Sequence, residues 1–202
     1  MLSHALLLLS LIVGPAQQQP TRAPVPVSDL QEALVSGLVE VSITGSGGSS
    51  GDVITLTIRR AVRRPLRLRL AQGTVLRSGS AAVQNMIVAA LKGERIDANK
   101  YRPTDVIDLP DDKERIYLLE AYCLDFEKEN PGASDRFSIA AVDGSALTVI
   151  RAVPQESRSI PVIQAALWLA AGVTKASIQE RFDVSDSDVL IAERAVATVK
   201  QR

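Results

Sequence analysis

Apolar and polar residues alternate along several short stretches in the first two thirds of the chain. The clearest are residues 53–58, which are rich in β-branched side chains, and residues 66–70, which read Leu-Arg-Leu-Arg-Leu. Such alternation places successive side chains on opposite faces of a strand. We therefore predict a strand in each stretch, and we expect the two strands to form a hairpin across residues 63–65.

Other segments continue this apolar pattern and are also predicted as strands. They are residues 35–44, 74–76, 83–91, 116–123 and 136–142. The sequence Gly-Ser-Gly-Gly-Ser-Ser-Gly-Asp of residues 45–52 interrupts the pattern. It lacks the Lys-Ser/Thr ending of a phosphate-binding loop and leads into a strand instead of a helix, so we interpret it as a flexible hairpin loop.

The apolar period becomes helical from residue 145 onward. Helices are predicted at residues 146–153, 161–172, 177–182 and about 186–200, and an earlier helical turn is predicted at residues 29–34. The last helix has Ser185 and Asp188 in the spacing of a capping box. Strands followed by helices are typical of α+β proteins. We predict an α+β fold, in which an antiparallel β-sandwich or barrel-like sheet carries a C-terminal helical layer.

The N-terminal residues have a different composition from the rest. Residues 1–16 contain an apolar run that ends in Gly-Pro-Ala, which is typical of a signal peptide, and the run is too short to span a bilayer. Residues 17–28 are polar and rich in proline, which predicts an extended linker. We therefore expect residues 29–202 to form a single exported domain, located outside the cell or in the cell envelope.

Charge and histidine content exclude several function classes. The chain has 23 basic and 23 acidic residues, so its net charge gives no attraction to nucleic acid or to an anionic membrane. Its one histidine, His4, lies in the predicted signal peptide. The mature protein then has no imidazole for a Ser-His-Asp or Cys-His pair or for a zinc site. We expect no metal site, no cofactor and no nucleic-acid partner.

The chain has a single cysteine, Cys123, at the end of the predicted strand 116–123. Alternation places it on the same face as Tyr117, Leu119 and Ala121, which carries no charge. We therefore expect the thiol to point inward. A lone buried cysteine most often packs as a small hydrophobic side chain, so that role is the first alternative.

An isolated polar residue stands in the most apolar predicted helix. Gln164 lies among apolar residues of the segment 161–172, and a buried carboxamide without partners costs about 1–3 kcal/mol. Trp168 follows four positions later on the same helix face. We expect Gln164 to meet Cys123 beneath Trp168. Gln84, which also lies in an apolar segment, is the rival candidate but lacks a nearby tryptophan.

Two short motifs together resemble a known family. Tyr122-Cys123 at a strand end, followed by the apolar-Gln-x-Ala-apolar-Trp pattern of residues 163–168, is similar to the thioester domain of Gram-positive bacterial surface adhesins. In that family the cysteine sulfur displaces ammonia from the glutamine side chain. The resulting internal thioester captures an amine or another nucleophile on a target surface.

The resemblance implies a role for each matching residue. Cys123 would supply the sulfur, Gln164 the acyl group and Trp168 the tryptophan of the motif. Tyr122 and Asp125 flank the sulfur and are expected to line the site; Asp125 either positions a nucleophile or ends the strand. The implied function is a single covalent attachment to an amine-bearing protein or glycan, without enzymatic turnover.

A cluster of six arginines supports a different class of function. Its members are Arg59, Arg60, Arg63, Arg64, Arg67 and Arg69. Such a cluster can bind an acidic polysaccharide or another polyanion. The simpler interpretation is that Arg67 and Arg69 face solvent opposite three core leucines and protect a strand edge. The alternative function is therefore a noncovalent exported binding or envelope-associated module that uses the Arg-rich hairpin, with Cys123 only packing.

Overall fold

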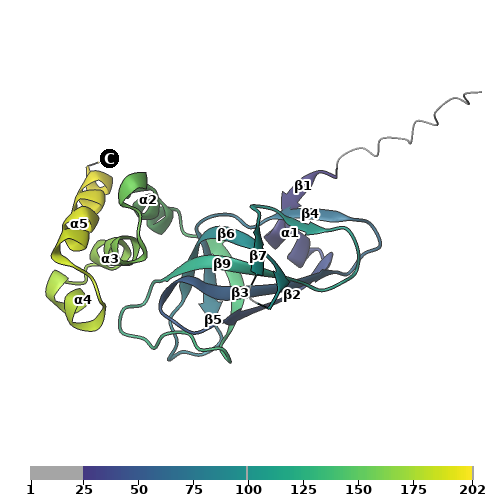
Figure 1. The fold of residues 1–202 in the computed structure, drawn as a ribbon, viewed down its shortest axis with the longest axis horizontal. Helices are drawn as coiled ribbons and strands as arrows, with labels where there is room; N and C mark the ends of the chain where they lie inside the picture. The colour runs from purple at the N-terminus through teal and green to yellow at the C-terminus, as the bar shows by residue number, and fades with distance from the viewer. Residues whose placement is uncertain (1–24, 99, 202) are drawn as a thin grey trace, which may run out of the picture.

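The protein is described by a computed structural model that covers residues 25–98 and 100–201. The predicted signal peptide, residues 1–16, and most of the predicted linker lie outside the described residues. The described chain has an α+β fold with a closed antiparallel barrel, a small second sheet and C-terminal helices, which confirms the predicted fold class. Of the two predicted sheet arrangements, the structure has the barrel (Figure 1).

Six strands form the barrel in the order β5-β10-β2-β3-β9-β6, and pairing of β5 with β6 closes it. Their bounds are β2 (Val39–Gly45), β3 (Ser50–Arg60), β5 (Thr74–Ser78), β6 (Met86–Asp97), β9 (Arg115–Cys123) and β10 (Arg136–Val142). A further strand, β7 (Lys100–Pro103), extends the sheet beyond β6. Closure leaves β3 with two antiparallel neighbours, β2 and β9.

The second sheet lies at the barrel end that carries the N-terminal elements (Figure 1). It consists of β1 (Val27–Asp29), β4 (Leu66–Arg69) and β8 (Ile107–Leu109), with β4 in the centre, and the helix α1 (Leu30–Val35) follows β1 directly. The predicted hairpin between residues 53–58 and 66–70 is therefore wrong, because both edges of β3 and both edges of β4 are taken by other strands. The predicted linker also extended too far, since Val27 and Ser28 belong to β1.

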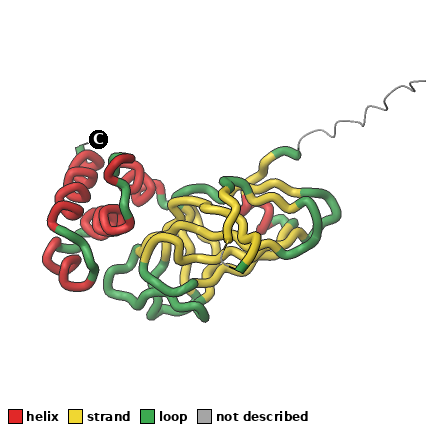
Figure 2. Tube along the Cα trace, in the orientation of Figure 1, coloured by secondary structure: helices red, strands yellow, loops and turns green. Residues whose placement is uncertain are grey.

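The C-terminal helices gather at the opposite end of the barrel (Figures 1 and 2). They are α2 (Gly144–Ala152), the short 3-10 helix η1 (Gln155–Ser157), α3 (Ile160–Ala170), α4 (Lys175–Arg181) and α5 (Asp186–Lys200). The helix α3 contacts β3 and β9 and also packs on α2 and α5. In the part of the chain that the structure describes, none of the helices has the length and apolar character needed to cross a membrane.

The two hydrophobic patterns that mattered for the site are confirmed by burial. On β9 the side chains of Tyr117, Leu119, Ala121 and Cys123 are all fully buried, as their shared face predicted. On α3 every residue from 162 to 168 is buried, Gln164 included. The end of β9 and the buried helix α3 therefore meet at the seam between the barrel and the helices.

Candidate functional site

Gln164 and Cys123 lie in direct contact at this seam, and both are 0% exposed. The Gln164 Oε1 atom accepts a hydrogen bond from the backbone N–H of Cys123 at 2.9 Å, and Gln164 Nε2 donates to the Cys123 carbonyl at 2.8 Å. The carboxamide thus forms the two hydrogen bonds to Cys123 that a neighbouring strand would form. It satisfies two backbone groups that would otherwise be left unpaired where β9 ends.

A third hydrogen bond reaches the same carboxamide from the glycine-rich loop. The Ser50 hydroxyl donates to Gln164 Oε1 at 2.5 Å. The carbonyl oxygen of Gln164 therefore has two donors, one from β9 and one from the start of β3. Hydrogen bonds at a carbonyl oxygen draw electron density from the carbonyl carbon and favour attack on it by a nucleophile.

The thiol of Cys123 faces the same loop. Its Sγ atom donates to the backbone carbonyl of Ser49 at 2.7 Å and lies 3.6 Å from Met86 Sδ. Burial is the main reason that the pKa of this thiol is raised to about 12; the negative charge of Asp125 raises it further and Arg181 opposes the shift. At neutral pH the sulfur therefore carries its proton, and burial protects it from oxidants.

Trp168 closes the seam from the helical side, one turn of α3 beyond Gln164. Its ring packs edge-on against Phe126, which lies in the loop after Cys123, with ring centroids 5.0 Å apart, and against Phe182 at 5.5 Å. The guanidinium of Arg181 stacks over Phe126. Trp168 is only 3% exposed, so its ring is buried within this aromatic cluster.

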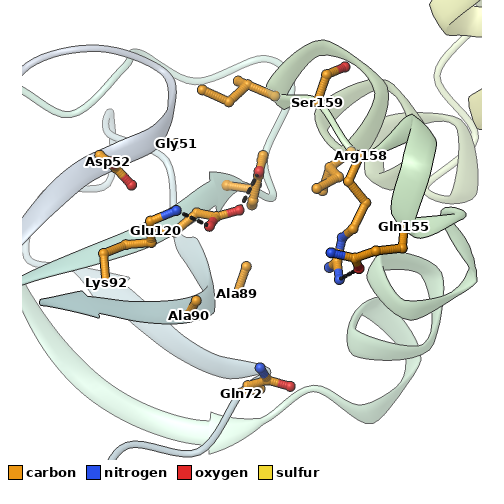
Figure 3. Close-up of a pocket in the computed structure, with 13 residues that line it drawn as sticks. Gly51, Asp52, Gln72, Ala89, Ala90, Lys92, Glu120, Gln155, Arg158 and Ser159 are labelled. Carbon is orange, nitrogen blue, oxygen red and sulfur yellow. Dashed lines mark hydrogen bonds and ion pairs between the residues drawn. The ribbon is translucent and has the colours of Figure 1, made fainter. Parts of the chain in front are cut away.

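Tyr122 is fully buried, as expected for a site-lining residue, but it lies on the other face of β9. Its hydroxyl donates to Glu120 Oε1 at 2.7 Å, and Glu120 Oε2 pairs with Lys92. These side chains line a cavity of about 420 Å³ between the barrel and the helices. Figure 3 shows Lys92 and Glu120 on the barrel side and Arg158 on the helix side.

Ile163 and Tyr122, which precede Gln164 and Cys123 in the sequence, line this cavity together with Gly51. The cavity therefore reaches the residues that adjoin Gln164, Cys123 and Ser50 along the chain. It provides open space next to a seam whose own side chains are buried.

Asp125 has a structural environment. Its Oδ2 atom accepts hydrogen bonds from the backbone and the side chain of Asn85, at 2.8 and 2.9 Å, and pairs with Lys128 at 3.1 Å. These contacts hold the end of β9 against the residues before β6. Of the two roles expected for Asp125, its contacts favour the one of ending the strand.

The rival glutamine, Gln84, lies elsewhere. It is also buried, at 1% exposed, but its Nε2 atom donates to Asn130 Oδ1 at 3.0 Å. No hydrogen bond joins it to Cys123 among the described residues. Contact with Cys123 therefore singles out Gln164.

Four of the six arginines are divided between the two sheets, and the other two lie in the connection between them. Arg59 and Arg60 end β3, whereas Arg67 and Arg69 lie on β4. Arg59 is paired with Glu40 at 2.5 Å. On β4 the residues in register with Arg67 and Arg69 include Asp108 and Asp29, respectively.

Within the described residues, Arg59 is the one arginine of the cluster that forms an ion pair; Asp108 and Asp29 are register neighbours of Arg67 and Arg69 without a salt bridge to them. The three leucines opposite Arg67 and Arg69 are buried, as predicted, although β4 is a central strand and has no free edge to protect. Arg63 and Arg64 lie in the connection between β3 and β4.

Sequence reasoning missed Ser49 and Ser50. Both lie in the loop that was interpreted as a flexible hairpin loop, and β3 in fact begins at Ser50. The available signal was weak: two serines between glycines, followed by a strand. Gly47, Gly48 and Gly51 all have positive φ angles, which only glycine adopts readily, so the glycine content sets the path of the loop toward Gln164.

Comparison with known proteins identifies no relative: no family model, no curated protein and no solved structure matches the chain.

Proposed function

We propose that Cys123 and Gln164 form an internal thioester, and that the protein uses it to attach itself covalently to an amine-bearing protein or glycan on a surface outside the cell. One observation carries the proposal. The Gln164 carboxamide lies directly against Cys123, with both side chains buried. The residues come from separate elements, β9 and α3, so the contact between the Gln164 carboxamide and the Cys123 backbone arises from tertiary packing.

The chemistry balances without a cofactor. The Cys123 sulfur attacks Cδ of Gln164; the Sγ–Cδ bond forms, the Cδ–Nε2 bond breaks, and the nitrogen leaves as ammonia with the thiol proton. A nucleophilic amine later attacks the same carbon, an amide bond forms, and Cys123 regains its thiol. Each molecule reacts once, so the process is attachment and not turnover.

Burial acts on both halves of this reaction: it holds the residues together and excludes water, and it also keeps the Cys123 thiol protonated. Enclosure holds the Gln164 carboxamide on the backbone of the residue that carries the thiol, and this proximity replaces the activation that a histidine base provides in other nucleophilic sites. Exclusion of water by the Trp168 cluster slows hydrolysis of the thioester. Export remains part of this proposal and rests on the predicted signal peptide.

The first prediction concerns the mass of the intact protein. Mature wild-type protein is expected to weigh one ammonia less than its sequence, and methylamine is expected to add its own mass and to release one thiol. Cys123→Ala and Gln164→Ala should both show the full mass, because each removes one partner of the bond. Gln84→Ala is the matched control and should still lose ammonia.

The competing account is a noncovalent binding module in which Cys123 only packs. It predicts the full mass for wild-type protein and a thiol that is labelled as soon as the protein is unfolded. The covalent account predicts no free thiol in freshly unfolded wild-type protein under amine-free acidic conditions. A full mass with a labelled thiol would therefore reject the proposed function.

A further inference from the structure

The glycine-rich segment 45–52 contacts both Gln164 and Cys123. Its composition did not predict these contacts. The Ser50 hydroxyl donates to Gln164 Oε1 at 2.5 Å, and the carbonyl of the preceding residue, Ser49, accepts the Cys123 thiol at 2.7 Å. Two consecutive residues of one loop thus hold the carbonyl and the nucleophile of the same reaction.

We infer that Ser50 is a catalytic residue of thioester formation and of amine capture: its hydroxyl and the Cys123 backbone N–H form an oxyanion hole around Oε1 of Gln164. This inference rests on the proposed function. Both donors already point at the oxygen on which negative charge develops when a nucleophile adds to Cδ. Such preorganised donors stabilise a transition state because they need no reorientation during the reaction.

The donor pair compensates for a weak nucleophile. The raised pKa of Cys123 keeps its sulfur protonated at neutral pH, so the attacking group gains little from ionisation. Polarisation of the Gln164 carbonyl is the remaining source of activation that the contacts provide. The backbone carbonyl of Ser49 orients the S–H bond of Cys123. The Ser50 hydroxyl and the Cys123 N–H polarise the side-chain carbonyl of Gln164.

The position of Ser50 is fixed by the backbone around it. Ser50 begins β3 and is in register with Tyr122 of β9. The next residue, Gly51, has a φ angle of 87° and lies so close to Ile160 that a Cβ atom would be 2.5 Å from Ile160 Cδ1. The first turn of α3 therefore packs directly on the loop, and the hydroxyl of Ser50 and the carboxamide of Gln164 are held by adjoining rigid elements.

The test compares the rate of ammonia loss among loop variants. Each protein is prepared in denaturant with Cys123 as a mixed disulfide, reduced, and refolded by dilution, and its intact mass is followed with time. Ser50→Ala is expected to form the thioester about 100-fold more slowly than wild type, the usual effect of losing one oxyanion donor. Its preformed thioester should also react more slowly with methylamine.

Two further variants separate catalysis from loop structure. Ser46→Ala changes an exposed serine of the same glycine-rich segment, whose side chain makes no hydrogen bond among the described residues, so its rate should equal that of wild type. Ser50→Thr keeps a hydroxyl and should restore most of the rate. Trp168 fluorescence in urea checks that each variant is folded.

The outcomes distinguish this inference from the proposed function. If wild-type protein loses ammonia and Ser50→Ala loses it equally fast, the role of Ser50 is rejected and the thioester stands. Equal slowing of Ser46→Ala and Ser50→Ala, or a hundredfold loss of rate in folded Ser50→Thr, also rejects it. If wild-type protein never loses ammonia, the proposed function fails and the role of Ser50 fails with it.

Discussion

At the residue scale, one carboxamide satisfies two backbone groups of Cys123 and accepts a third hydrogen bond from Ser50. This explains how Gln164 can be completely buried in an apolar helix. Sequence reasoning identified the cost of burying this amide and the residue that it meets. It did not predict that the amide bonds to backbone atoms of Cys123, because every residue type has the same backbone donor and acceptor.

The two hydrogen bonds between the Gln164 carboxamide and the backbone of residue 123 can be tested without the thioester, in a Cys123→Ala background that lacks the sulfur. Gln164→Leu should lower the free energy of unfolding by roughly 2–5 kcal/mol, because it leaves the N–H and the carbonyl of residue 123 buried without partners. Urea unfolding provides the measurement. Gln84→Leu is the matched control: it breaks a single hydrogen bond, to Asn130, and should cost clearly less. Equal losses of unfolding free energy in the two variants would show that the hydrogen bonds of Gln164 to residue 123 add no stability beyond that of an ordinary buried amide.

Glu94 lies on β6, is 6% exposed and has a shifted pKa. Burial alone would raise its pKa, but hydrogen bonds and the positive charges of Arg115 and Arg102 outweigh burial and hold the pKa below its ordinary value of 4.5. A carboxyl group with a lowered pKa stabilises the folded state above its unfolded pKa, and the stabilisation is lost as the pH falls through the folded pKa.

We therefore expect the stability advantage of wild-type protein over Glu94→Gln to be full at about pH 7 and to shrink below pH 4.5. Urea unfolding of both proteins across this range measures the difference. An advantage that grows on acidification would contradict the assigned direction of the shift.

At the element scale, local patterns predicted the strands and helices better than their pairing. Alternation located β3, β4 and β9, and apolar spacing with proline and glycine located α3. The pairing of β3 with β4 was wrong because both strands have alternating sequences that fit many partners, and the choice depends on contacts with β1, β8, β2 and β9 far away in sequence. Register with distant strands has no local signal.

The contact between Gly51 and α3 gives a prediction at this scale. Gly51→Ala places a Cβ in a left-handed conformation and against Ile160, whereas Gly37→Ala meets the same backbone strain, with a φ angle of 66°, in open space. Gly37→Ala should cost about 1–2 kcal/mol, the usual strain of that conformation. Gly51→Ala should cost about 1 kcal/mol more, because Ile160 must leave its rotamer.

The excess should disappear when Ile160→Ala is added to Gly51→Ala, since the contact is then removed. Chemical denaturation of the two single variants and the double variant provides the test. Equal costs for Gly37→Ala and Gly51→Ala would show that α3 does not rest on this glycine.

At the scale of the whole molecule, a closed barrel carries its N-terminal sheet at one end and its helices at the other (Figure 1). Cys123 and Gln164 lie where the helices meet the barrel, so neither part contains the candidate site alone. Fold class and the pairing of these two residues could be predicted from composition, period and motif. The choice between a sandwich and a closed barrel, and the contribution of the glycine-rich loop, could not be predicted, because both arise from contacts between segments that share no sequence signal.

The covalent bond itself gives the most direct test. Mature protein is digested with an acid protease without reductant, and the fragments are sequenced by mass spectrometry. Our account predicts that the fragment containing Cys123 is joined to the fragment containing Gln164, with a combined mass one ammonia below the sum of the two. Separate fragments of full mass, with a free thiol on Cys123 and an intact carboxamide on Gln164, would contradict it.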